Sequence, residues 1–75
     1  MQELDLAILT HDLPTLHLEA GDIGTIVFVH QGGKAYEVEF AAADGRTIGV
    51  ETLTAEQVIP LSGDQILHVR DLASA

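Results

Sequence analysis

The chain has 75 residues, which leaves room for a single domain, and a domain of this size buries only about 60% of the surface that its unfolded form exposes. Twelve acidic against three basic residues give a formal charge of -9, which disfavours direct nucleic-acid binding, because affinity for phosphates comes mainly from Lys and Arg. The absence of cysteine excludes disulfides, thiolate metal sites and a thiol nucleophile.

The same composition suits a reducing cytoplasm, and we expect a cytoplasmic protein. Residues Met1 to Thr10 carry Glu3 and Asp5 and lack Lys and Arg, so they are typical of neither a signal peptide nor a membrane span. The strong negative charge has two interpretations: it keeps a small domain soluble, or it forms an acidic face that meets a basic partner. Composition does not separate the two.

The first strand is predicted over Leu4 to Leu9, with Leu4, Leu6 and Ile8 on one side and Asp5, Ala7 and Leu9 on the other. The loop Thr10 to Ala20 that follows is long for so small a domain. Its residues Leu13, Leu16 and Leu18 are expected to pack over an open end of a barrel. If the loop is exposed instead, the same leucines form an apolar patch for a partner.

The strongest strand prediction is Ile23 to His30, which is almost wholly apolar. Gln31 to Lys34 contains two glycines and supplies a hairpin turn, because glycine readily adopts positive φ. The partner strand, Ala35 to Ala41, alternates between apolar and acidic side chains, which is typical of a half-buried strand. The inward side chains are predicted to be Tyr36, Val38 and Phe40, and the outward ones Glu37 and Glu39.

A turn at Asp44-Gly45 precedes a further strand from Thr47 to Leu53. Thr54 to Gln57 resembles a helix start but has room for a single turn only, so we expect a 3-10 turn before the last strand. Ile66 to Val69 are candidates for an additional edge strand. The predicted fold is all-β: a five- to six-stranded antiparallel SH3-like barrel with a long first loop, one domain over residues 1–72 and a frayed tail at 73–75.

The segment Gly21 to Val27 is interpreted as architectural. Gly21 is expected to adopt a left-handed turn conformation, Asp22 to cap that turn, and Gly24 to permit close backbone approach where the strand bends. Gly45 has the same role in its own turn. A phosphate-binding loop is disfavoured, because the segment opens a strand and has no neighbouring Lys.

Several of these motifs occur together in the order of a known family. The Leu-Pro loop, Gly-Asp-Ile-Gly-Thr-Ile-Val, Ala-Tyr-Glu-Val-Glu-Phe, Asp-Gly-Arg-Thr and a closing Leu-Thr resemble a family of small bacterial proteins known as domain of unknown function 4926. The resemblance covers roughly Leu4 to Pro60. It implies an SH3-like barrel and brings no established activity or catalytic residue.

More remotely, the chain is similar to SH3-like barrels of ribosomal and transcription-factor modules and of the nitrile hydratase β subunit. It departs from the nucleic-acid binders because it lacks their basic loops. It also lacks the partner subunit that would hold a nitrile hydratase metal.

The histidines are the candidates for a metal site. His11, Asp12 and His17 share the first loop, and His30 or His68 could add a third nitrogen for zinc. None of them shows the tight spacing of a recognised site, so solvated histidines are the favoured interpretation, and we expect no metal or other cofactor. Whether His11 and His17 bind a metal stays open.

Carboxylates on neighbouring strands invite a comparison with acid/base catalysis. Glu37, Glu39 and Glu51 are expected to lie close together on the outer faces of their strands. An exposed surface with no cleft leaves such carboxylates ordinary, so we expect no catalytic role for them. No hydroxyl has the neighbours of a nucleophile either, so we expect no enzyme. As an interaction face, the same acidic row complements an Arg- or Lys-rich partner.

The leading hypothesis is therefore a non-catalytic protein-interaction module, in one version an antitoxin- or immunity-like partner of a basic protein. The alternative is an accessory domain or small subunit of an enzyme complex. We expect a protein partner, no membrane, and a monomer or weak homodimer. The residues predicted to bind the partner are Glu37, Glu39, Glu51, Leu13, Leu16 and Leu18.

Overall fold

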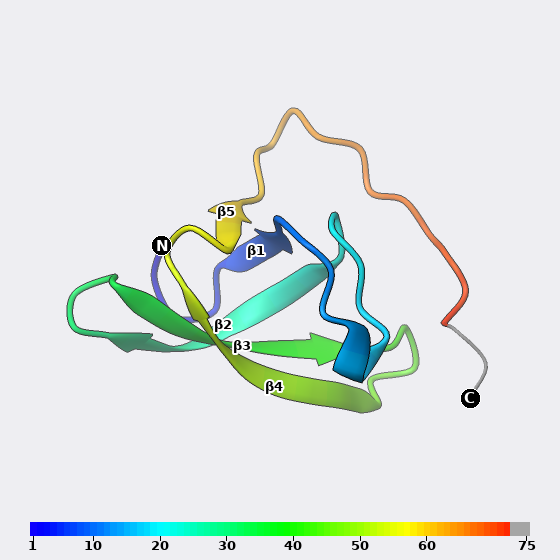
Figure 1. Cartoon of the computed structure of the whole chain (residues 1–75). Coiled ribbons are helices and arrows are strands. Elements are labelled where there is room, and N and C mark those ends of the chain that lie inside the picture. Colours follow the sequence, from blue (N-terminus) through cyan, green and yellow to red (C-terminus); the bar gives the residue numbers. More distant parts are fainter. Residues whose placement is uncertain (73–75) are drawn as a thin grey trace.

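The structure is a computed structural model that describes residues 1–72. It contains five strands and one 3-10 turn, arranged along the chain as in Figure 1. Their bounds are β1 Leu6–Leu9, η1 Pro14–Leu16, β2 Ile23–His30, β3 Ala35–Ala41, β4 Thr47–Thr54 and β5 Val58–Pro60. Among residues 1–72, no helix has the length and apolar character needed to cross a membrane.

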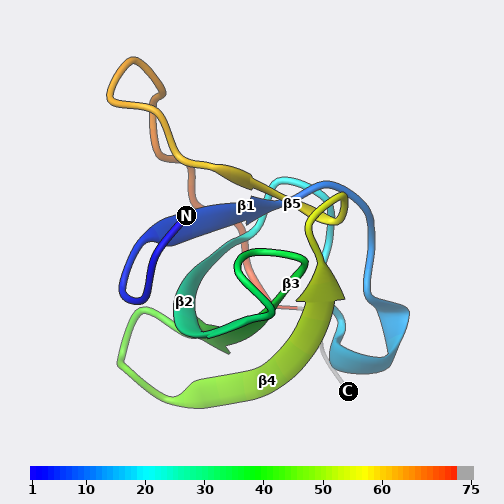
Figure 2. The same cartoon turned by 90° about the vertical axis from the view of Figure 1, so that its left-hand side faces the viewer.

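The five strands form one antiparallel sheet in the order β4-β3-β2-β1-β5. The two edge strands, β4 and β5, are joined by residues 55–57 alone. In a flat sheet they would lie four strand spacings apart, about 19 Å, whereas four Cα–Cα steps reach about 15 Å at most. The sheet must therefore curl, and Figure 2 shows β4 bending round toward β5.

The prediction of an all-β antiparallel domain is confirmed, but barrel closure is not observed. No backbone pairing joins β4 to β5 in the described part of the chain, so both remain edges. Ile66 to Val69 form no strand. The predicted frayed tail at 73–75 lies outside the described residues.

The 3-10 turn lies in the first loop and not before the last strand, because Pro14 is pre-set for a helical first position and His17 N–H bonds to its carbonyl at 3.1 Å. Before β5 there is only a turn. In it the Gln57 side chain accepts a hydrogen bond from the backbone N–H of Thr54 at 2.8 Å. β1 begins at Leu6 and not at Leu4, because Leu4 has a positive φ of 73° in a preceding turn.

The core lies on the inner side of the curled sheet, under the first loop. The predicted alternation of β3 is confirmed, since its apolar side chains are buried. Burial of apolar surface stabilises the fold by about 25 cal/mol per Å². The buried residues are Ala7, Leu9, Leu18, Ile26, Tyr36, Val38, Phe40, Leu53 and Val58.

The turn before β2 has the predicted geometry. Gly21 has a φ of +96°, and the Asp22 carboxylate accepts a hydrogen bond from the Glu19 backbone N–H at 2.8 Å. Gly24 packs directly against β3, with no room for a side chain. Gly45 also has a positive φ, of +90°. These positions shape the chain reversals and the strand contact on which the surfaces below depend.

Candidate interaction surfaces

The side of the sheet opposite the core carries a mixed apolar and acidic surface. Residues paired directly across antiparallel strands point to the same face, so the register assigns its members. We call this surface the outer face. It includes Leu6, Ile8, Ile23, Thr25, Phe28, His30, Ala35, Glu37, Glu39, Val50, Thr52, Thr54 and Ile59.

Two of its rows bring apolar side chains beside carboxylates. One row runs from Leu6 through Thr25 and Glu39 to Val50, and a second joins Phe28 to Glu37. Leu6 is 44%, Phe28 48% and Val50 49% exposed. Exposed apolar side chains that share one face with carboxylates provide both apolar area and charge for contact with a partner.

Glu37 and Glu39 are both half-buried and hydrogen-bonded. The His30 Nε2 atom lies 3.0 Å from Glu37 Oε2, and the Thr47 hydroxyl donates to Glu39 Oε2 at 2.9 Å. The His30 ring also makes an edge contact with Phe28, with ring centroids 4.7 Å apart. The two carboxylates are thus held in position on the outer face.

Glu51 does not share the surface of the other two carboxylates. It pairs with Val38 across β3 and β4, so it points to the inner side of the sheet, where its edge position leaves it half-buried. Glu37 and Glu39 pair instead with Thr52 and Val50. The row of three expected from the sequence is therefore a row of two.

The leucines of the first loop pack on the core, which was one of the two expectations for them. Leu18 is 3% exposed, and Leu13 and Leu16 are partly buried against the buried cluster. Leu16 also packs over Gly49 of β4. A Cβ atom placed on Gly49 would lie 2.9 Å from the Leu16 Cδ1 atom. Because these leucines are buried or partly buried, they do not form the exposed apolar patch that was the other expectation.

A second surface is formed by the segment after β5. Residues 61–72, which we call the strap, have no regular secondary structure and pass the end of the sheet near the first loop (Figure 1). Three of its apolar side chains face outward, since Ile66 is 85%, Leu67 64% and Val69 96% exposed, whereas Leu72 is 40% exposed and Leu61 is partly buried. Burial of these three side chains therefore contributes little to holding the strap.

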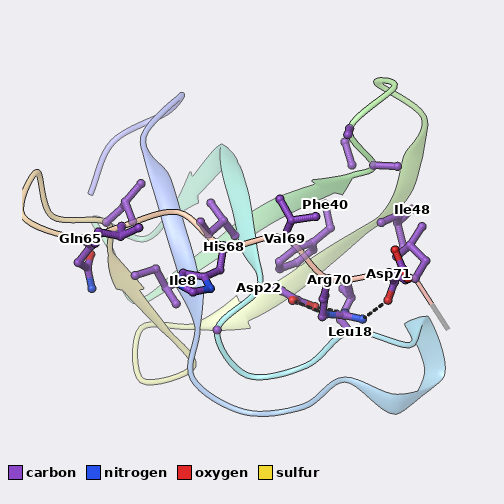
Figure 3. Close-up of a pocket in the computed structure, with 18 residues that line it drawn as sticks. Ile8, Leu18, Asp22, Phe40, Ile48, Gln65, His68, Val69, Arg70 and Asp71 are labelled. Atoms are coloured by element: carbon purple, nitrogen blue, oxygen red, sulfur yellow. Dashed lines mark hydrogen bonds and ion pairs between the residues drawn. The ribbon is translucent and has the colours of Figure 1, made fainter.

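Arg70 attaches the strap to the turn before β2. Its Nε atom donates to Asp22 Oδ1 at 2.9 Å, and its Nη2 atom donates to Asp22 Oδ2 and to the His17 carbonyl oxygen, the latter at 3.1 Å. Glu19 Oε2 lies 3.5 Å from Nη1. Figure 3 shows the guanidinium beside Asp22, with a further bond to the Asp71 carbonyl. This is a two-pronged pairing of the kind that arginine makes best.

The ion pair changes the ionisation of both partners. Partial burial raises the pKa of the Asp22 carboxyl, but the hydrogen bonds from Arg70 and from the Glu19 backbone outweigh it and leave that pKa below its usual value. The hydrogen bond to Asp22 raises the pKa of the Arg70 guanidinium. Both groups are therefore charged at neutral pH, and an ion pair attaches the strap there.

An open groove of about 700 Å³ lies between the strap and the end of the sheet. Its sheet-side wall is mostly apolar, and Figure 3 shows Ile8, Phe40 and Ile48 facing the strap. Ile8 and Ile23 belong both to the groove and to the outer face. The groove is therefore continuous with the outer face.

The histidines remain apart from one another. His11 lies within 3.2 Å of the Gln57 side chain, His30 binds Glu37, and His68 lines the groove. No group of three or more His, Asp or Glu side chains within residues 1–72 is arranged to hold a metal ion.

Sequence reasoning missed the strap, its groove and the Asp22–Arg70 pair. Asp22 was assigned a turn-capping role only, and Ile66 to Val69 a strand. A signal was present, because Arg70 is one of three basic residues in the chain and stands among the apolar residues Ile66, Leu67, Val69 and Leu72. Such a cation needs a carboxylate partner wherever that stretch packs.

The fold and surfaces define a small acidic all-β domain, a curled antiparallel sheet with one loop-covered side and one mixed apolar and acidic side. The chain belongs to the family described as Domain of unknown function (DUF4926), which matches residues 3–60. The match ends with the last residue of β5, so the strap lies outside it. Searches of curated proteins and of solved structures found no match.

Proposed function

We propose that the protein is a non-catalytic protein-interaction module whose partner is a basic protein, in the manner of an antitoxin or immunity protein. The partner docks on the outer face. The observation that carries this proposal is the register, which sets Glu37 and Glu39 among exposed apolar side chains on one side of the sheet.

The chemistry of this face favours a cationic partner. The residues of the outer face include two carboxylates and no Lys or Arg, in a chain with a formal charge of -9. Exposed Phe28 and Val50 supply apolar area, and the neighbouring carboxylates supply orientation and faster association. The complementary partner surface has apolar side chains at its centre and Lys or Arg side chains beside them.

The experiment is affinity capture with quantitative mass spectrometry from the native cytoplasm, using the full chain. We expect the wild type to retain a basic protein at stoichiometric level, and the double variant Glu37→Lys, Glu39→Lys to lose it. The matched control, Glu3→Lys with Glu56→Lys, changes the net charge equally at exposed positions away from the outer face. Loss in both double variants, or in neither, would contradict docking on the outer face.

We also propose that the domain has the SH3-like type of barrel architecture. Support comes from the strand order, in which β5 returns beside β1, and from the three-residue link between β4 and β5 that forces the sheet to curl. An experimental structure in which the sheet is flat and β4 and β5 lie far apart at its two edges would overturn this proposal.

A further inference from the structure

We propose that the strap is autoinhibitory: Arg70 occupies, within the same chain, the site that an arginine-bearing extended segment of the basic partner binds. The inference rests on the proposed function and deepens it, because it names the side chain that is recognised. Four observations carry it: the acceptor site, the strap, the groove and the outer face.

The acceptor site is built by the first loop and the turn before β2, without help from the strap. The Asp22 carboxylate is fixed by the Glu19 backbone N–H at 2.8 Å, and the Asp12 carboxylate by the Ala20 backbone N–H at 2.9 Å. The His17 carbonyl adds a neutral acceptor beside them. A guanidinium finds here a planar pair of oxygens and further negative charge already in place.

The strap is a weak occupant of its own site apart from Arg70. Ile66, Leu67 and Val69 are 64% to 96% exposed, so they gain little from the groove that they border. Held mainly by one guanidinium, the strap opens at low cost and exposes both the carboxylates and the apolar wall.

The groove has space for a better occupant than the strap. About 700 Å³ remains beside an apolar wall that includes Ile8, Phe40 and Ile48. Because Ile8 and Ile23 also belong to the outer face, a partner that docks there reaches the groove without a break in the contact surface. The ligand that fits is an extended segment with one arginine flanked by apolar side chains.

The strap competes with a partner's segment for the same site, and its covalent attachment favours the strap. A segment attached by a short linker acts at an effective concentration of about millimolar, so a free arginine-bearing segment must bind more tightly than the strap to displace it. The strap therefore suppresses binding of weakly matching basic segments and admits a partner that also engages the outer face. This is selectivity by an internal competitor.

The test uses the full chain and a synthetic peptide with the sequence of residues 61–72 as the probe, with binding followed by NMR. Arg70→Gln is expected to release the strap of the full chain and to bind the peptide about tenfold more tightly than the wild type does. Arg46→Gln is the matched control, because it removes the same charge from a residue in the β3–β4 turn. Its affinity for the peptide should equal that of the wild type.

Equal peptide affinity of the wild type and Arg70→Gln would overturn the inference. So would equal binding of a peptide whose arginine is replaced by glutamine. Exchange of straps between two copies, seen as concentration-dependent dimers, would overturn it as well. Adding Asp22→Asn to Arg70→Gln should abolish peptide binding, and retained binding would also contradict it. The proposed function fails separately, through capture that ignores Glu37 and Glu39.

Discussion

Gly24 of β2 lies so close to Val38 of β3 that a Cβ atom on Gly24 would be 2.5 Å from the Val38 Cγ1 atom. The carbonyl oxygen of Glu39 and the ring of Phe40 would each be 2.9 Å away. Val38 is fully buried, so it has nowhere to move. The contact brings β2 and β3 together at the centre of the sheet.

Gly24→Ala is therefore expected to destabilise the fold by about 1–3 kcal/mol, because overpacking a core forces the backbone or neighbouring rotamers to shift. Denaturant unfolding measures the change. Gly63→Ala is the matched control, since nothing lies within 4 Å of its Cβ position. Equal stability of the two variants would mean that the close contact has no energetic weight.

The contact between Leu16 and Gly49 allows a second test, of how the first loop closes over the sheet. A Cβ on Gly49 would lie 2.9 Å from the Leu16 Cδ1 atom. Gly49→Ala should cost about 1 kcal/mol in the wild type through this clash. In a Leu16→Ala background the clash is gone, and the same change should stabilise β4 by about 0.5–1 kcal/mol, because alanine loses less backbone entropy than glycine.

The four chemical denaturation curves of this double-mutant cycle give the coupling energy. An additive cycle would show that the loop does not pack on Gly49 in solution.

The β2–β3 hairpin was predictable because local pattern and fold agree there. The alternation of Tyr36, Val38 and Phe40 with two glutamates has a single interpretation, and the glycines at 32 and 33 fit only a tight turn with positive φ. The Gly21 turn was predictable for the same reason. In each case, the residues that determine the structure lie within a few positions of one another.

The face of Glu51 was not predictable in this way. In β4 the apolar residues Ile48, Val50 and Leu53 do not keep a period of two, so the alternation does not say which side is buried. The register also shifts between Phe40 and Ala41. The Asp22–Arg70 pair is a harder case, because 48 positions separate its members and no local pattern links them.

Replacements of Asp22 separate its two roles. Asp22→Ala removes both the turn cap on Glu19 N–H and the acceptor for Arg70, and is expected to cost about 1–2 kcal/mol in unfolding free energy. Asp22→Asn keeps a carbonyl oxygen for the cap and loses the charge, so its cost should be smaller. Both should release the strap, seen as fast backbone motion of residues 66–72 by NMR relaxation. A rigid strap in either variant would mean that other contacts hold it.

Acid should release the strap of the wild type. The pKa of Asp22 lies below its usual 3.8 in the folded chain, so the ion pair with Arg70 contributes fully above pH 3.8. That contribution is lost as the pH falls through the folded pKa, because the protonated carboxyl no longer attracts the guanidinium. Glu19 and Asp12 also attract the Arg70 guanidinium through their negative charges.

NMR relaxation of residues 66–72 across a pH titration should therefore show a strap that is ordered at pH 7 and becomes mobile at a pH below 3.8. The Arg70→Gln chain should show a mobile strap at every pH, while its sheet amides stay as ordered as in the wild type. A wild-type strap that is already mobile at neutral pH, or that stays ordered in acid, would contradict the assignment of this role to the Asp22–Arg70 pair.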